Sequence, residues 1–229
     1  MGLIFLALIF FVFCSSCSVS WQTEVKGSIS EIREFVLAGN ADGIYSDIMC
    51  GYREVEYVVD GYSNDLIPFG VLTIRFDEDV VGVGEGVFFS LFVGTIKYNG
   101  ECEKNPFDGS YAFDIKTIID KSQNVLLEVK VGNNVFSMKL NSAMSDWVVN
   151  CDRAFDIFMD KYSKELKGLI HDGVFMGEVY IKIVGDYNDG YCEYLYYVNC
   201  VGRMGESVAI MISPKTGNIL ATTSNMQSE

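Results

Sequence analysis

Residues 178–201 read Glu-Val-Tyr-Ile-Lys-Ile-Val-Gly-Asp-Tyr-Asn-Asp-Gly-Tyr-Cys-Glu-Tyr-Leu-Tyr-Tyr-Val-Asn-Cys-Val. On both sides of the Asn-Asp-Gly segment every second residue is apolar, and this period of two predicts β-strands. We therefore expect strands at about 178–184 and 191–201, joined by a turn. Two further strands are expected at about 207–213 and 218–223. The short links predict that neighbouring strands are antiparallel.

A helix is expected directly before these strands. Its apolar residues recur every three to four positions, which is the spacing of one buried helix face. They are Trp147, Cys151, Ala154, Phe155, Phe158, Tyr162 and Leu166. Acidic residues lie toward its start and lysines toward its end, as the helix dipole favours, and Gly168 would end it. This helix would cover the sheet face that carries Val179, Ile181 and Ile183.

One helix followed by an antiparallel meander resembles the PepSY and cystatin-like modules of exported bacterial proteins. The segment Ile212-Ser-Pro-Lys-Thr-Gly217-Asn-Ile-Leu220 is also similar to the PepSY ending, in which a Thr-Gly turn joins two strands. The resemblance covers about residues 146–223. It implies an α+β fold with a binding or inhibitory role, and it brings no catalytic residue with it.

Residues 24–145 are expected to form a first unit. Ser28 and Glu31 match a capping box, and apolar residues follow at helical spacing, so a helix is expected that Gly39-Asn40 would close. Asn40–Gly43 could open a short second helix through Ile44, Tyr45 and Ile48, which would complete a helical hairpin. From about residue 52 the period changes to two. Strands are then expected at 53–59, 70–76, 87–98, 111–119, 125–131 and 134–140, the last two joined as a hairpin by Gly132-Asn133.

The predicted fold class is thus α+β. An antiparallel β-rich N-terminal subdomain, which includes the helical hairpin, occupies residues 24–145. The helix packed on a four-stranded antiparallel meander occupies residues 146–229.

Residues 1–17 are predicted to be a signal or targeting segment. Gly2–Phe13 is an uninterrupted run of apolar or small residues, and it is shorter than the roughly 20 residues that span a bilayer as a helix. Ser15-Ser16-Cys17 resembles the end of a bacterial lipoprotein signal, although Cys14 stands where an aliphatic residue is usual and no Lys or Arg precedes the run. The resemblance implies lipidation of Cys17. Plain cleavage near Ser16–Ser20 and an uncleaved anchor are the alternatives.

The chain of 229 residues has a formal net charge of −14, with no acidic block at either end. Nucleic-acid binding requires clustered Lys and Arg to neutralise phosphates, and the chain has no such cluster. The composition therefore argues against a nucleic-acid partner.

Motifs for catalysis, metals or cofactors are incomplete. The one histidine, His171, would have to meet Cys102 or Cys151 to form a thiol-protease site. The glycines at 82–86 lack the third glycine position and the following helix of a dinucleotide loop. Residues 186–190 resemble the start of a calcium loop that lacks its final Glu, and they are better interpreted as a turn. No catalytic residue, metal ligand or cofactor is predicted, and we favour a non-enzymatic protein.

Five cysteines lie beyond the targeting segment: Cys50, Cys102, Cys151, Cys192 and Cys200. Cys192 and Cys200 share one expected strand and would be roughly 26 Å apart, so they cannot pair with each other. A disulfide from Cys151 to either one is geometrically conceivable. The alternative is that all five are small, buried, reduced residues.

The expected binding residues are Tyr180, Tyr191, Leu195 and Tyr197. They lie on the sheet face that the helix leaves uncovered, together with Lys182, Glu193, Val201 and Met211. So large an apolar face is seldom left to water. It either packs against the first unit or binds a protein, peptide or glycan, for which tyrosine is a favoured contact residue.

The sequence therefore predicts an exported lipoprotein at the cell surface, anchored to a membrane, with a non-catalytic binding or inhibitory function. Two alternatives remain open. One is a secreted hydrolase in which two acidic residues meet across a cleft. The other is a structural subunit that self-assembles through its tyrosine face.

Overall fold

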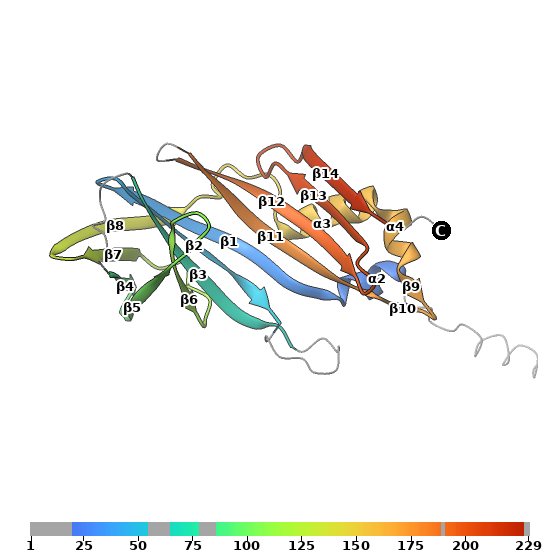
Figure 1. Cartoon of the computed structure of the whole chain (residues 1–229), viewed down its shortest axis with the longest axis horizontal. Coiled ribbons are helices and arrows are strands. Elements are labelled where there is room, and N and C mark those ends of the chain that lie inside the picture. Colours follow the sequence, from blue (N-terminus) through green and yellow to red (C-terminus); the bar gives the residue numbers. More distant parts are fainter. Residues whose placement is uncertain (1–19, 55–64, 78–85, 189–190, 227–229) are drawn as a thin grey trace, which may run out of the picture.

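A computed structural model of the chain describes residues 20–54, 65–77, 86–188 and 191–226. The described part is mostly β, with 59% of its residues in strands and 12% in helices. A single sheet closes at one end into an eight-stranded antiparallel barrel and continues at the other as an open four-stranded sheet (Figure 1). In the part of the chain described, no helix is both long and apolar enough to cross a membrane.

The barrel comprises the first eight strands. They are β1 (Ile29–Ala41), β2 (Ile44–Arg53), β3 (Ile67–Phe76), β4 (Val87–Val93), β5 (Ile96–Lys104), β6 (Tyr111–Ile115), β7 (Val125–Val131) and β8 (Asn134–Ser142). Their order is β1-β2-β3-β6-β5-β4-β7-β8, and β8 pairs back onto β1 at Leu37 and Ala38. Fully buried side chains such as Leu72, Leu91 and Leu127 fill the interior, which is therefore a packed core.

The open sheet is an antiparallel meander. Its strands are β11 (Gly177–Asn188), β12 (Tyr191–Gly202), β13 (Ser207–Ile212) and β14 (Ile219–Asn225). The remaining elements are α2 (Trp21–Lys26), α3 (Cys151–Lys161), α4 (Ser163–Gly168), and a short hairpin of β9 (Ile170–His171) and β10 (Val174–Phe175). Helix α3 begins where the Asn150 side chain accepts a hydrogen bond from the Arg153 amide.

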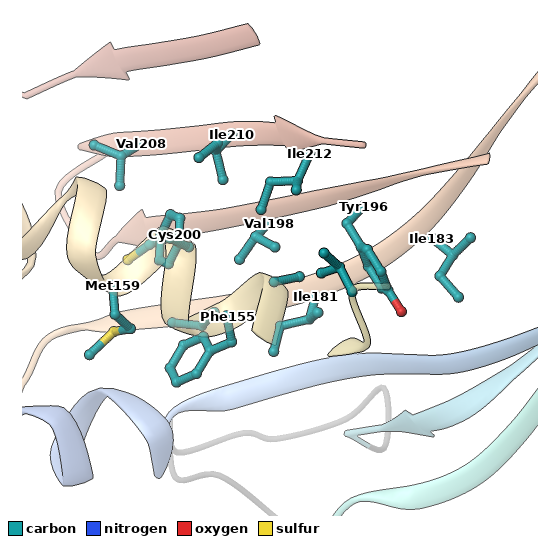
Figure 2. Packing of buried hydrophobic residues seen from close by; sticks show 14 of the residues in the cluster. Phe155, Met159, Ile181, Ile183, Tyr196, Val198, Cys200, Val208, Ile210 and Ile212 are labelled. Atoms are coloured by element: carbon teal, nitrogen blue, oxygen red, sulfur yellow. The ribbon is translucent and has the colours of Figure 1, made fainter. Parts of the chain in front are cut away.

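Helix α3 covers one face of the meander (Figure 2). Phe155 and Met159 of the helix pack against Ile181, Val198 and Ile210, which come from three neighbouring strands. Every second residue of these strands is fully or nearly fully buried here, because alternate side chains of a strand point to the same face. This core is separate from the core inside the barrel.

Strand β1 joins the two parts. It runs parallel to β11 from Ile29 to Ile32, and it is antiparallel to β2 from Glu31 to Ala41. A bulge between Arg33 and Phe35 bends it into the barrel. Gly51 lies opposite this bulge, where an added Cβ would come 1.9 Å from the Ile32 carbonyl oxygen. Only glycine fits at that position.

The predicted α+β, cystatin-like fold class is wrong, and so is the N-terminal helical hairpin. Those residues form β1 and β2, joined by Asp42 and Gly43 with φ values of 48° and 77°, as in a two-residue hairpin turn. In β1, Val36 faces the core under the helix, whereas Phe35 and Leu37 face the barrel interior. A strand buried on both faces loses its period of two, and its apolar spacing then imitates a helix.

Smaller differences have local causes. The single helix expected over 147–166 is interrupted at Tyr162, which has φ −113° and ψ 27°, and it continues as α4. The strand expected at 87–98 is a hairpin, because Gly94 adopts φ 56° and turns the chain between β4 and β5. Residues 55–59 of the strand expected at 53–59 lie outside the described ranges.

Because β1 contributes side chains to both cores, we expect them to unfold together. Leu127→Ala inside the barrel and Phe158→Ala under the helix each remove a side chain with 0% exposure and should each cost about 2–5 kcal/mol. Trp21 and Trp147 both pack on the core under the helix, so their fluorescence reports that part. In urea titrations, Leu127→Ala should therefore shift the tryptophan transition as well.

Val135→Ala is the matched control for this experiment. Val135 is 59% exposed on β8, so its truncation should change stability by less than about 0.5 kcal/mol. A tryptophan transition that does not move in Leu127→Ala would show that the barrel and the meander unfold independently.

Candidate functional site

The sheet face opposite α3 carries the expected binding residues, and we call it the tyrosine face. It consists of Tyr180, Lys182, Glu193, Leu195, Tyr197, Val201 and Met211, from β11, β12 and β13. None of its apolar members belongs to either core. Val201 is 41% exposed, and Tyr180, Leu195, Tyr197 and Met211 are each partly exposed. The face is thus not buried between the barrel and the meander.

Strand register places these side chains in rows across the sheet. Lys182, Tyr197 and Met211 are direct neighbours on three adjacent strands. Tyr180 lies beside Asn199 of β12 on one side and Glu31 of β1 on the other. Neighbouring strands are about 4.8 Å apart, so each row is a continuous strip of side-chain surface.

Charged groups lie around Tyr180. The Lys182 ammonium is 4.9 Å from the centre of the tyrosine ring and 3.3 Å from Glu31 Oε2. The Tyr180 hydroxyl donates a hydrogen bond to Glu178 Oε2 at 2.5 Å. Burial, together with the hydrogen bond and negative charge of Glu178, raises the pKa of Tyr180 above its ordinary value. Tyr180 therefore stays a neutral donor over the physiological pH range.

Tyr191 was also expected on this face. It is the first residue of β12 and pairs with Asn188, but its side chain lies outside what the structure describes.

A second cluster, which sequence reasoning missed, lies where the β11–β12 hairpin meets the outside of the barrel. Asp47 of β2 is completely buried, and its Oδ2 accepts hydrogen bonds from Arg75 Nη1 at 3.2 Å and from the Tyr194 hydroxyl at 3.1 Å. The Tyr45 and Tyr194 hydroxyl oxygens are 2.6 Å apart. Because the Tyr194 proton goes to Asp47, Tyr45 is the donor in that pair.

Contacts at the rim extend this cluster. The Tyr45 and Tyr187 rings are 5.3 Å apart, and the Arg75 guanidinium is 5.6 Å from the centre of the Tyr187 ring. The Tyr187 hydroxyl donates to Asp77 Oδ1 at 3.0 Å. The cluster therefore ties β11 and β12 to β2 and β3 through side chains more than 100 positions apart in the sequence.

Burial dominates the electrostatics of this cluster. Desolvation raises the pKa of Asp47, and the nearby Arg75 charge opposes the increase without cancelling it. Asp47 Oδ1 has no hydrogen-bond partner among the described residues, which makes its charged form still more costly. Burial and the Asp47 charge raise the pKa of Tyr194, so that its hydroxyl remains protonated and can keep donating.

The sequence does contain a signal for this cluster. Asp47 is the one charged residue in the segment Ile44–Gly51, in which every residue is buried. A charge in a fully buried strand requires a partner. The local sequence of β2 gives no indication that Arg75 and Tyr194 are those partners.

The five cysteines in the described part of the chain are all free, so none of them forms a disulfide. Burial raises the pKa of Cys50 and Cys192 to about 11 and that of Cys102 and Cys200 to about 12, so these thiols are poor nucleophiles. His171 is exposed on β9, whereas Cys102 is buried in the barrel core. His171 and Cys102 therefore do not form a thiol-protease site.

The other motifs have little structural support. Within the described residues, no group of three or more His, Cys, Asp or Glu could hold a metal ion. Asp186 and Asn188 end β11, while 189–190 and the glycines at 82–85 lie outside the described ranges. Open depressions of the described residues include one of about 520 Å³ between α2 and α3, one of about 370 Å³ on α2 and one of about 250 Å³ beside the β1–β2 turn.

Comparison with known proteins found no matching family model, no matching curated protein and no matching solved structure. The site is therefore interpreted from its own geometry.

The raised pKa of Asp47 predicts a pH-dependent stability. A carboxyl group with a folded-state pKa above its ordinary value of 3.8 binds its proton more tightly in the folded chain. The unfolding free energy should therefore decrease as the pH rises from about 4 through the folded-state pKa of Asp47. Asp47→Asn cannot titrate, so its stability relative to the wild type should increase over that window in urea titrations at several pH values.

Asp146→Asn is the control. Asp146 is exposed, and its hydrogen bond to Lys215 lowers its pKa below the ordinary value of 3.8. The small effect of Asp146→Asn should therefore appear at lower pH than the Asp47 window and with the opposite sign, because solvent screens the pair and the wild type loses this stability as the pH falls. A constant stability difference between Asp47→Asn and the wild type across the window would refute the assignment.

Proposed function

We propose that the protein is an exported, lipid-anchored binding protein without catalytic activity, and that its tyrosine face binds a protein or peptide. The observation that carries the proposal is the open tyrosine face, where Tyr180, Leu195 and Tyr197 contribute to neither core. Aromatic residues on a rigid sheet offer large contact areas at low entropic cost, which is why tyrosine is enriched in interfaces.

The shape of the face favours a macromolecular partner. Its residues lie in flat rows across three adjacent strands, with Lys182 and Glu193 among the apolar side chains. A small ligand or sugar is usually held in a concave site with converging polar groups. The net charge of −14 would steer a partner that carries basic residues toward this chain.

The hydrolase alternative has less geometric support. Its mechanism requires two carboxyl groups that face a common cleft. Asp47 has a raised pKa, but it is completely buried and faces Arg75 and two tyrosines. Asp108 and Asp120 have lowered pKa values because they accept hydrogen bonds from Ser110 and Ser122, respectively, within exposed turns.

Peptide binding can be tested without knowledge of the natural partner. All described elements lie within residues 20–226, so residues 18–229 contain the whole described fold. A random peptide library selected on this protein should yield peptides with aromatic and basic residues. Tyr197→Ser and Leu195→Ser should each weaken a selected peptide about tenfold or more in calorimetry, as expected for central interface contacts.

Val135→Ser, on the barrel strand β8 and 59% exposed, is the matched control and should leave the affinity unchanged. Selected peptides that bind both face variants as tightly as the wild type would contradict the proposed site. A glycan array tests the competing hypothesis of sugar binding. Glycan binding that is lost in Tyr197→Ser would show that the face binds a sugar and not a peptide.

The intact mass of the protein tests whether Cys17 carries a lipid anchor. When the full chain is produced in a bacterium, we expect it in the membrane fraction, with diacylglycerol on an N-terminal Cys17 in the intact mass. Cys17→Ser should abolish the modification, whereas Cys14→Ser should retain it, because only the last residue of the signal is lipidated. An intact mass that includes Met1 would overturn the export proposal.

A further inference from the structure

Strand β14 is the last strand of the open sheet. Its outer edge pairs with no strand in the part of the chain that the structure describes. All seven of its residues, Ile219–Asn225, are exposed, so the strand has almost no burial against either face. Figure 1 shows the strand at the outer edge of the open sheet, beside β13. A free edge presents unpaired amide and carbonyl groups that can pair with another strand.

The residues of β14 lack the usual protection of a free edge. The segment reads Ile-Leu-Ala-Thr-Thr-Ser-Asn, with no charged residue and no proline, although Lys and Pro are the common means of blocking such edges. Its pairing with β13 is irregular near Leu220 and regular from Ala221 to Asn225. The regular part therefore offers a flat edge of five residues.

The Tyr162 hydroxyl shows which backbone groups of β14 point to its open edge. The Tyr162 hydroxyl lies 2.9 Å from the carbonyl oxygens of both Ala209 and Thr223, which share its one proton, and these two residues face each other across β13 and β14. Both carbonyls therefore point into the space between the two strands. Because backbone groups alternate along a strand, those of Thr222 and Ser224 point to the open edge.

We propose that β14 pairs in antiparallel orientation with β14 of a second copy of the chain, about a two-fold axis through Thr223. Thr222 of each copy then exchanges both backbone hydrogen bonds with Ser224 of the other, and the two Thr223 residues lie opposite each other. This register uses the regular part of the strand from Ala221 to Asn225 and continues the sheet across the axis.

The residues of the edge suit a second copy as the occupant, because no like charges would meet there. Two chains with a net charge of −14 repel each other over most of their surfaces, but β14 carries no charge on either of its faces. The two-fold register places threonine beside threonine and serine beside threonine, and both are favourable cross-strand pairs. The tyrosine face plays no part in this contact, so the inference does not depend on the proposed function.

The oligomeric state of residues 18–229 tests the proposal. In sedimentation velocity from about 1 µM to about 1 mM, the range in which weak protein pairs dissociate, the wild type should shift from monomer to dimer. Hydrogen exchange of the Thr222 and Ser224 amides should slow over the same concentrations. A wild type that remains monomeric throughout, or amides whose exchange does not change, would overturn the proposal.

Charge variants test the register. Thr223→Lys and Thr223→Glu each place like charges opposite each other at the axis, and each should be monomeric. An equimolar mixture of the two should form a heterodimer, because the charges are then complementary. Thr223→Val preserves the β-branched shape and should dimerise as the wild type does.

Tyr197→Ser and Val135→Lys are the controls and should both dimerise, since neither residue lies on β14. Thr223 is exposed, so thermal unfolding should show that the charge variants remain folded. Dimerisation of both single charge variants, or a mixture that remains monomeric, would rule out this edge as the contact.

Discussion

Strand β1 must serve two cores at once, and the rest of the structure depends on this. Its first residues pair with β11, Leu37 and Ala38 close the barrel against β8, and β2 pairs with it from Glu31 to Ala41. Side chains that alternate along a strand point in opposite directions, so Val36 enters one core while Phe35 and Leu37 enter the other. Neither the barrel nor the meander is complete without it.

The cluster around Asp47 is the second connection between the two parts. Tyr194 and Tyr187 of the β11–β12 hairpin reach the outside of the barrel, where Asp47, Arg75 and Asp77 hold them. A buried ion pair contributes little net stability because desolvation offsets the attraction. Its directional hydrogen bonds fix how the hairpin lies on the barrel. Among the described residues, no strand pairs with the outer edge of β14, and the apolar side chains of the tyrosine face belong to neither core.

Sequence patterns were reliable where an element has one buried face. Val179, Ile181 and Ile183 are buried and alternate with partly exposed residues, so the strands of the meander, and Tyr180, Leu195 and Tyr197 on its other face, could be assigned from spacing alone. The hairpin of β7 and β8 was predicted for the same reason. The prediction failed at β1 and β2, where eight consecutive residues of β2 are buried and no alternation remains.

The sequence by itself determined which residues share a face of each amphipathic strand, because that follows from the geometry of a few consecutive residues. Only the tertiary structure decided that the sheet closes into a barrel, since closure depends on pairing β1 with β8, about 100 residues later in the chain. It also decided the partners of Asp47, which lie 28 and 147 positions away. Contacts at such separations leave no periodic trace in the local sequence, so they are established only when the chain folds.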